Sequence, residues 1–222
     1  AIPAEKIRED RFLKTNTLVL QLRGYPEIFG VPEEDIETAQ AILKNAGYDG
    51  EKNKLVITLC FTDDEPSRKR AQILHDAWET IGVETKVIFK PGIEYLSAIN
   101  TEKADLFNYI WIGDFADPLA FLELFRGSSS LNVTGWKNSK YDSLLEEAAK
   151  ITDATKRYEK LAEAEQLLLD DGAIYPISRT LSVNIVDFDV IKGWFDNALD
   201  IHPLKYLKFV RPDPRANVVK AD

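Results

Sequence analysis

The sequence of 222 residues has no methionine, a single cysteine and only two histidines. Because Cys60 stands alone inside the apolar run LVITLCF, the chain can form no internal disulfide and no Cys-x-x-Cys metal or redox site. The histidines, His75 and His202, lie far apart and show none of the spacings of zinc sites. We therefore expect no metal and no other cofactor.

Long apolar runs and leader segments are missing as well. No run approaches the roughly 18 consecutive apolar residues of a membrane span, and no signal peptide precedes Ala1. Since the chain also lacks an initiator methionine, we expect it to be a processed or excised piece of a longer polypeptide.

Positive charge is scarce relative to negative charge. The chain has 28 Lys and Arg residues against 37 Asp and Glu residues, which gives a net charge of −9. This balance argues against a nucleic-acid partner, because nucleic acid is bound by a basic surface. The sequence also lacks a Gly-x-Ser-x-Gly elbow, a P-loop and a dinucleotide-binding fingerprint, so it offers no recognisable catalytic apparatus.

The first half of the chain reads as alternating strands and helices. After a short strand-like run, TLVLQL (17–22), a helix is predicted over 33–46, closed by Gly47. The runs that follow predict, in order, a strand over 55–61, a helix over 67–81, a strand over 83–89, a short helix over 92–100 and a fully buried strand over 105–112. This succession predicts an α/β fold, with a mostly parallel sheet flanked by helices.

The second half is predominantly helical. We expect helices over 119–125, 141–150 and 156–169, the last opened by Asp153 as N-cap and closed by Gly172. The buried stripe of this last helix is predicted to be Tyr158, Leu161, Ala164 and Leu168. Short strands are predicted over 173–178, 181–186 and 203–210, and a polar, disordered tail from Arg211.

Two aspartates interrupt the apolar stretch WIGDFADPLAFLELF. Asp117 directly precedes Pro118 and an apolar helical pattern, which is typical of a helix N-cap followed by proline at the first helical position. Asp114 follows the predicted buried strand, at the sheet edge where open α/β folds bind ligands. Beside Trp111 and Phe115 its carboxylate can receive an ammonium group, or it is a solvated loop residue.

Several linked stretches resemble one known family. IWIGDFADPLAFLELF, SSSLNVTGWKNSKYDSLLEEA and ITDATKRYEKLAEAEQLLLDDGAIYPI follow one another as in the oligopeptide/dipeptide-binding proteins of ABC importers, the family 5 extracellular solute-binding proteins. Upstream, IETAQAILKNAGYDG, LVITLCF and SRKRAQILHDAWETIGVET fit the same family in the same order.

The resemblance implies a clamshell of two α/β lobes that encloses a ligand, with this chain as the second lobe and the segment that returns to the first. The expected organisation is a hinge-side connection over 1–32, a ligand-binding lobe over 33–180, a return segment over 181–210 and a tail over 211–222. The implied partners are a small peptide or other solute, the membrane subunits of an ABC importer and the first lobe of the same parent. The implied location is the periplasm or the outside of the cytoplasmic membrane, with a parent that can be lipid-anchored.

The resemblance also implies site residues. The family's Trp-x-x-Asp motif, in which the aspartate pairs with a peptide's α-ammonium group, falls on Trp111 and Asp114. The other candidate ligand contacts are Asn108 and the neighbouring Ile112, Gly113 and Phe115, together with Asn132 and Trp136 in a loop that is expected to face the cleft. Some peptide binders carry an arginine three residues before the tryptophan, where this chain has Asn108, so the resemblance does not extend to recognition of a peptide carboxylate.

Two alternatives stay open at this point. The chain can be a hydrolase or transferase that uses Asp114 and Asp117 as a carboxylate pair. It can also be a solute-binding lobe for a ligand that is not a peptide, such as a sugar. The leading interpretation is a non-catalytic peptide-binding lobe.

Overall fold

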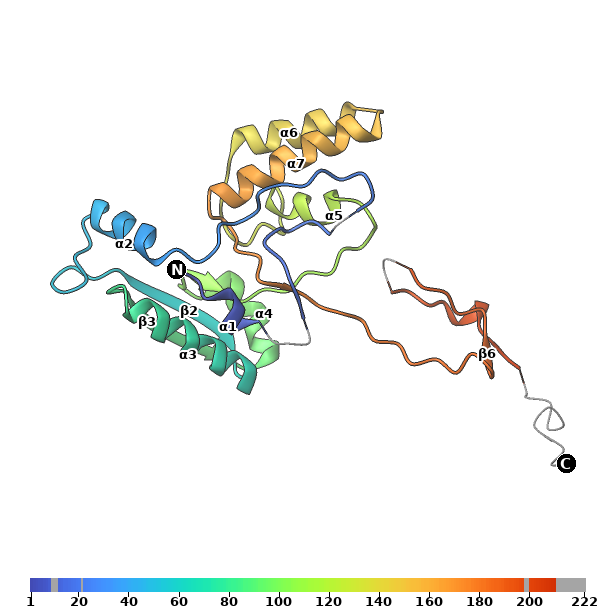
Figure 1. Cartoon of the computed structure of the whole chain (residues 1–222), viewed down its shortest axis with the longest axis horizontal. Helices are drawn as coiled ribbons and strands as arrows, with labels where there is room; N and C mark the ends of the chain where they lie inside the picture. Colours follow the sequence, from blue (N-terminus) through green and yellow to red (C-terminus); the bar gives the residue numbers. More distant parts are fainter. Residues whose placement is uncertain (9–11, 21, 198–199, 211–222) are drawn as a thin grey trace, which may run out of the picture.

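The structure is a computed structural model that describes residues 1–8, 12–20, 22–197 and 200–210. At its centre is a parallel sheet in the order β3-β2-β4, made of β2 (Val56–Thr62), β3 (Glu84–Lys90) and β4 (Leu106–Phe107). The strands are joined by α3 (Glu65–Glu79) and α4 (Gly92–Thr101) (Figure 1). The predicted strand–helix succession and the α/β fold class are therefore confirmed.

The two faces of the sheet are covered by different helices. Because side chains alternate along a strand, Leu59 and Phe61 of β2 pack against Leu74 and Trp78 of α3. Cys60, on the opposite face of the same strand, packs against α4 and is completely buried. The single cysteine is therefore part of the core.

The apolar run 105–112 forms much less strand than its composition predicts. Only Leu106 and Phe107 pair with β2, opposite Leu59 and Cys60. Beyond them three apolar side chains are exposed: Tyr109 (47%), Ile110 (66%) and Ile112 (76%). The prediction of a fully buried strand over this whole run is wrong.

A tyrosine from α4 marks the point at which the pairing ends. The Tyr95 hydroxyl donates to the carbonyl oxygens of both Cys60 and Asn108. The Asn108 carbonyl is therefore bonded to a side chain of α4, and β4 ends at Phe107. The ligand-binding stretch predicted from the sequence therefore lies in a loop.

A helical layer is formed by the next segments: α5 (Leu119–Leu122), the 3₁₀ helix η1 (Glu123–Phe125), α6 (Ser139–Lys150) and α7 (Ala154–Asp170). The helices α6 and α7 lie side by side (Figure 1). Asp153 caps α7 by accepting the Lys156 amide at 2.9 Å, and Gly172 follows its end with a φ of +67°. Both helix-end predictions are confirmed.

The core of this layer is the stripe predicted for α7. Leu161, Ala164 and Leu168 are completely buried against α5 and α6, whereas Tyr158 is only partly buried at its edge. Fully burying one such leucine stabilises a fold by about 1.5–3 kcal/mol.

The N-terminal segments cross the body. They contain α1 (Ala4–Ile7), β1 (Leu13–Lys14), which pairs antiparallel with β5 (Ser178–Arg179), and α2 (Ile36–Asn45). The helix α2 begins later than predicted, because the Asp35 carboxylate accepts the Thr38 amide and makes Asp35 the N-cap. Within the predicted strand over 17–22, residues 17–20 and 22 are in no strand, and Gln21 lies outside the described residues.

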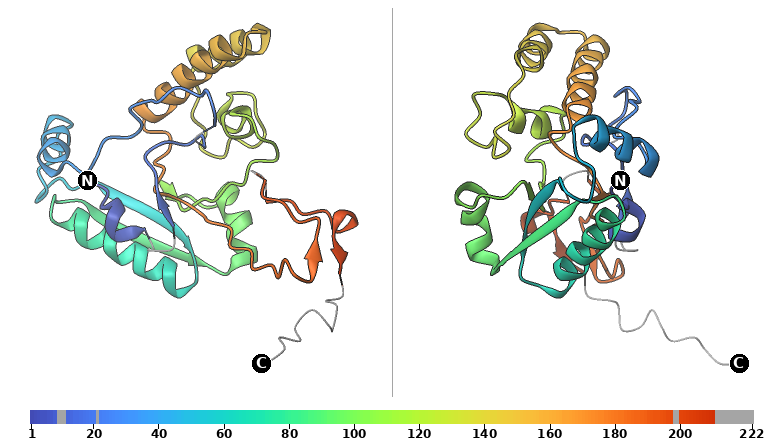
Figure 2. Two further views of the ribbon diagram at one scale, coloured as in Figure 1. Left: turned by 45° about the vertical axis from the view of Figure 1, so that its right-hand side comes forward. Right: turned by 90° about the vertical axis from the view of Figure 1, so that its left-hand side faces the viewer.

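After β5 the chain leaves the body as an extended arm (Figures 1 and 2). The arm carries β6 (Ile191–Lys192), the 3₁₀ helix η2 (Leu204–Tyr206) and β7 (Lys208–Phe209), with β6 and β7 antiparallel. Of the predicted strand over 203–210 only β7 forms, and of the strand over 173–178 only Ser178 enters β5.

The predicted strand over 181–186 is wrong, because this stretch has no strand partner in the described part of the chain. Its side chains Val183 and Ile185 are 81% and 97% exposed. The predicted tail, residues 211–222, lies outside the described residues. Among the helices that the structure describes, none is both long and apolar enough to cross a membrane.

Candidate functional site

The loop between β4 and α5 carries the predicted Trp-x-x-Asp motif. Exposure alternates along it: Ile110, Ile112 and Asp114 are exposed, whereas Trp111 and Gly113 are partly buried. The outward face of the loop thus carries the apolar side chains of Ile110 and Ile112, followed by the carboxylate of Asp114, with the half-exposed Phe115 next to it.

The Asp114 carboxylate has no hydrogen bond or ion pair with any other described residue. It lies well beyond the end of β4 at Phe107, so the expectation that it directly follows a buried strand is wrong. Its carboxylate is nevertheless open to an incoming cation, and an ammonium group is one cation that a carboxylate beside aromatic side chains receives well.

The inward-facing residues of the loop are fixed against α5. The Trp111 indole Nε1 donates to the Ala120 carbonyl at 2.9 Å, and its ring stacks on Tyr109 at 6.5 Å between centroids. Gly113 lies so close to the Phe121 ring that a Cβ would stand 3.0 Å from its Cζ atom. A larger residue at this position would require the Phe121 ring to shift by a small amount.

Asp117 lies one residue before the N-cap of α5, which is Pro118, so the predicted N-cap is off by one position; its carboxylate still holds the start of the helix and has an additional partner. Its Oδ1 accepts the Leu119 amide at 3.0 Å at the start of α5. Its two oxygens also accept two hydrogen bonds of 2.8 Å from the Arg157 guanidinium on α7. Partial burial by itself raises the pKa of Asp117, but the hydrogen bonds from Arg157 and Leu119 outweigh it and the pKa is lowered.

Asn108 lies at the end of β4. Its carbonyl accepts the Tyr95 hydroxyl, and its amide donates to the Cys60 carbonyl at 3.4 Å. Burial raises the pKa of Tyr95, which keeps this hydroxyl protonated as a donor. These contacts involve only the backbone of Asn108, and the role of its side chain as a ligand contact stays a prediction.

Asn132 and Trp136 lie in the second predicted contact region, but their polar atoms are used within the chain. The Asn132 Nδ2 donates to the Trp136 carbonyl at 2.8 Å, and its Oδ1 accepts the Thr134 hydroxyl at 2.8 Å. The Trp136 indole donates to Asp171 at 3.1 Å and its ring packs edge-on against Tyr141. Both side chains thus hold the 127–137 loop in shape, and their role as ligand contacts stays a prediction.

The sequence analysis missed Glu165, which is completely buried on α7. Its carboxylate accepts the amides of Leu18 (2.7 Å) and Val19 (2.9 Å) and the hydroxyl of Tyr25 (2.8 Å). Arg179 of β5 donates to the Val19 carbonyl at 2.6 Å from the other side. These contacts replace the strand pairing that the apolar run 17–22 predicted.

The sequence analysis also missed Arg157, the partner of Asp117, and the sequence contains a signal for each of these two residues. Glu165 falls on the apolar stripe of α7, between Leu161 and Leu168, where a charge indicates a buried partner. Arg157 lies in the first turn of the same helix, where a cation opposes the helix dipole and so indicates a specific acidic partner.

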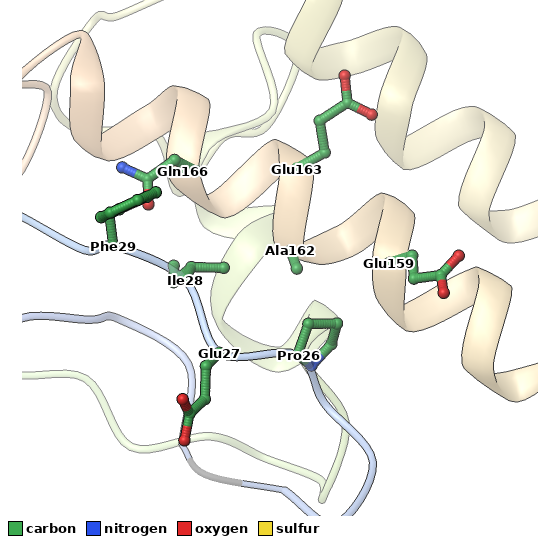
Figure 3. Close-up of a pocket in the computed structure, with 8 residues that line it drawn as sticks. All are labelled: Pro26, Glu27, Ile28, Phe29, Glu159, Ala162, Glu163 and Gln166. Atoms are coloured by element: carbon green, nitrogen blue, oxygen red, sulfur yellow. The ribbon is translucent and has the colours of Figure 1, made fainter.

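Grooves occur elsewhere on the surface. One of about 280 Å³ is bordered by Pro26, Glu27, Ile28 and Phe29 on one side and by Glu159, Ala162, Glu163 and Gln166 of α7 on the other (Figure 3). A second, of about 530 Å³, lies between the ends of α2 and α3. Neither is lined by a predicted site residue. Within the described ranges, no group of three His, Cys, Asp or Glu side chains is placed to hold a metal ion.

The chain is similar in sequence to one family of known proteins. A model of the bacterial extracellular solute-binding proteins, family 5 (middle part), matches residues 6–132. The oligopeptide-binding protein OppA of Bacillus subtilis (strain 168) is 31% identical over 151 residues, which cover 65% of this chain and 28% of OppA. The probable deoxycholate-binding periplasmic protein YgiS of Escherichia coli (strain K12) is 32% identical over 145 residues, 65% of this chain and 27% of YgiS.

A solved structure, Haemophilus influenzae OppA in complex with the peptide RPPGFSPFR, superposes with a TM-score of 0.77 at 21% identity. The superposition covers 95% of this chain and 43% of that one, and it supports the fold. The matched stretches thus span less than a third of the length of B. subtilis OppA and of YgiS, and less than half of H. influenzae OppA.

Proposed function

Because this chain belongs to the family 5 bacterial extracellular solute-binding proteins, we propose that it is part of a protein that captures peptides for uptake by an ABC importer. The observation that supports this most is the loop over residues 109–114, with apolar side chains directed outward and an unpaired carboxylate, Asp114, at its end. A short peptide lies along the loop, and its α-ammonium group pairs with Asp114.

The backbone of this loop supports a peptide ligand in particular. Among the described residues, the amides and carbonyls of 109–114 make no hydrogen bond to other backbone groups. An extended ligand backbone can therefore bond to them as an added strand does. A sugar ligand uses no such row of amides and carbonyls, so we place the non-peptide alternative second, with the deoxycholate-binding relative as its support.

The mechanism we propose is non-covalent. Asp114 is exposed in this chain, and an exposed ion pair contributes only about 0–1 kcal/mol. When a second lobe closes over the ligand, water is excluded and the same pair becomes stronger. The carboxylate-pair enzyme is disfavoured because both Asp117 oxygens are already bonded to Arg157.

The partners follow from the same proposal. The arm over 181–210 exposes a row of apolar side chains, among them Val183, Ile185 and Phe209. We propose that the first lobe of the parent protein covers this arm, and that the parent acts outside the cytoplasmic membrane together with the importer's membrane subunits. The proposed boundaries are those expected from the sequence: a connection over 1–32, the lobe over 33–180, the return segment over 181–210 and a tail over 211–222.

The ammonium pairing is tested by titrating the chain with tri-alanine and with N-acetyl-tri-alanine. The free peptide is expected to bind about twofold to fivefold more tightly than the acetylated one. Asp114→Asn is expected to abolish this preference. Asp196→Asn removes the same charge from an exposed position on the arm and serves as the matched control, with the preference retained. Equal affinity of the unsubstituted chain for both peptides would overturn the role of Asp114.

A further inference from the structure

The loop that carries Asp114 has almost no internal support. Among the described residues, the only backbone hydrogen bond of residues 109–116 runs from the Asp117 amide to the Phe115 carbonyl at 2.9 Å. A loop without its own hydrogen bonds takes its conformation from the elements that it contacts. For this loop, those contacts are made to α5.

The helix α5 cannot provide a rigid support by itself. It is a helix of four residues, and one isolated turn is unstable because helix formation has a costly nucleus. Trp111 and Gly113 nevertheless rest on it, through the hydrogen bond to Ala120 and the close contact with Phe121. The position of the loop therefore depends on what holds α5.

Two polar contacts link this segment to long helices: the Tyr141 hydroxyl of α6 donates to the Leu122 carbonyl at the far end of α5 at 2.6 Å, and Arg157 bonds Asp117 at the end that adjoins the loop. Arg157 belongs to α7, a helix of 17 residues, and its guanidinium bonds both oxygens of Asp117 in a two-pronged geometry that fixes distance and direction together. Asp117 in turn accepts the Leu119 amide and closes the loop three residues after Asp114. The side chains are only 21% (Arg157) and 26% (Asp117) exposed, so the pair is held away from solvent.

We propose that Arg157 is a positioning residue of the ligand site: through Asp117 it holds the loop over residues 111–117 in the conformation that directs Asp114 outward. The inference rests on the proposed function in so far as Asp114 meets the ligand. The contact between Arg157 and Asp117, and its effect on the loop, do not depend on any ligand.

The chain contains a matched control for this pair. Arg126 makes the same two-pronged contact with Glu123, with hydrogen bonds of 2.7 Å, and its side chain is 20% exposed. It lies after α5, at the end of η1, and makes no described contact with the loop over residues 111–117. Arg157→Gln and Arg126→Gln thus each remove a partly buried arginine with a two-pronged carboxylate contact, and Arg126→Gln also removes a 4.0 Å contact with Glu146.

The first test measures hydrogen exchange of the unliganded chain by NMR. Arg157→Gln is expected to accelerate exchange of the hydrogen-bonded protons of this segment, those of the Trp111 indole and of the Asp117 and Leu119 amides, by about tenfold, with Arg126→Gln leaving them unchanged. Arg157→Lys keeps the positive charge but cannot make the two parallel hydrogen bonds of the guanidinium group. It is therefore expected to restore only part of the protection of these protons from exchange. Unchanged exchange in Arg157→Gln, or equal acceleration in both Gln variants, would overturn the proposal.

The second test measures selectivity under conditions where every variant is folded. The ratio of affinities for tri-alanine and N-acetyl-tri-alanine is expected to fall to about one in Arg157→Gln and to persist in Arg126→Gln. An unchanged ratio in Arg157→Gln would contradict a positioning role. If the unsubstituted chain binds neither peptide, the proposed function fails, and the exchange measurement still decides whether Arg157 positions the loop.

Discussion

Replacing Glu165 by alanine tests how the crossing segment near Val19 is attached to the body. The carboxylate is completely buried and accepts three donors, and Ala accepts none. An unsatisfied donor costs about 1–3 kcal/mol according to its burial. Taking about 1 kcal/mol for each of the half-buried Leu18 amide and Tyr25 hydroxyl, and about 2 for the buried Val19 amide, we expect a loss near 4 kcal/mol.

The assay is urea unfolding at pH 7 followed by circular dichroism, with the slope of the transition compared between variants. Glu163→Ala is the matched control, because it makes the same substitution two positions away on α7 at a side chain that is 44% exposed. Its pairs with Lys140 and Lys160 are surface pairs, worth at most about 1 kcal/mol. A Glu165→Ala chain as stable as Glu163→Ala, with the same slope, would refute the reasoning.

Three further predictions concern pH, packing and the arm. Burial raises the pKa of Glu165 above its ordinary 4.5, and the hydrogen bonds from its donors offset part of this rise. The contribution of Glu165 to stability is therefore complete below pH 4.5 and is lost as pH rises through the folded pKa. In urea unfolding, the stability of the unsubstituted chain relative to Glu165→Gln should fall between pH 4.5 and about pH 7. Gly113→Ala should lower Tm by forcing Phe121 aside, while Gly92→Ala, with nothing within 4 Å, should leave it unchanged or raise it, and the opposite order would contradict the packing. A chain that ends at Thr180 should keep the Tm of the full chain to within about 3 °C, since the arm packs little on the body, and a larger loss would show that the arm supports it.

Local signals in the sequence predicted most of the body. The ends of α7 at Asp153 and Gly172 depend on neighbours within a few residues, and so does its buried stripe with Leu161 and Leu168. The structure confirms both predictions. The parallel strands were predicted for the same reason, since apolar runs alternating with amphipathic ones permit few other arrangements.

Contacts between distant parts of the chain were not predicted. Glu165 accepts the amide of Leu18, and Asp117 accepts the guanidinium of Arg157, although the two partners lie far apart in the sequence. Read from the sequence alone, a charged residue on a helix is usually assigned to the solvent-exposed face. The strand predicted over 105–112 pairs only at Leu106 and Phe107, and the next carbonyl, that of Asn108, accepts the Tyr95 hydroxyl from another element. Apolar composition alone does not determine burial, because Val183 and Ile185 in the apolar run 181–186 are exposed.

The candidate site divides in the same way. Trp111 and Gly113 proved to be anchors of the loop, and Asp117 an acceptor at the start of α5, whereas Asn132 and Trp136 have their polar atoms engaged within the chain. Only the exposed side chains of the 110–115 stretch remain available to a ligand.

The most direct test of the central claim is an NMR titration of the isotopically labelled chain with tri-alanine, in which the amides that shift are assigned. We predict that the largest shifts fall on residues 109–115 and disappear in Asp114→Asn. Shifts concentrated instead in the groove between Pro26–Phe29 and α7, or no shifts at the highest soluble peptide concentration, would contradict a peptide site at this loop.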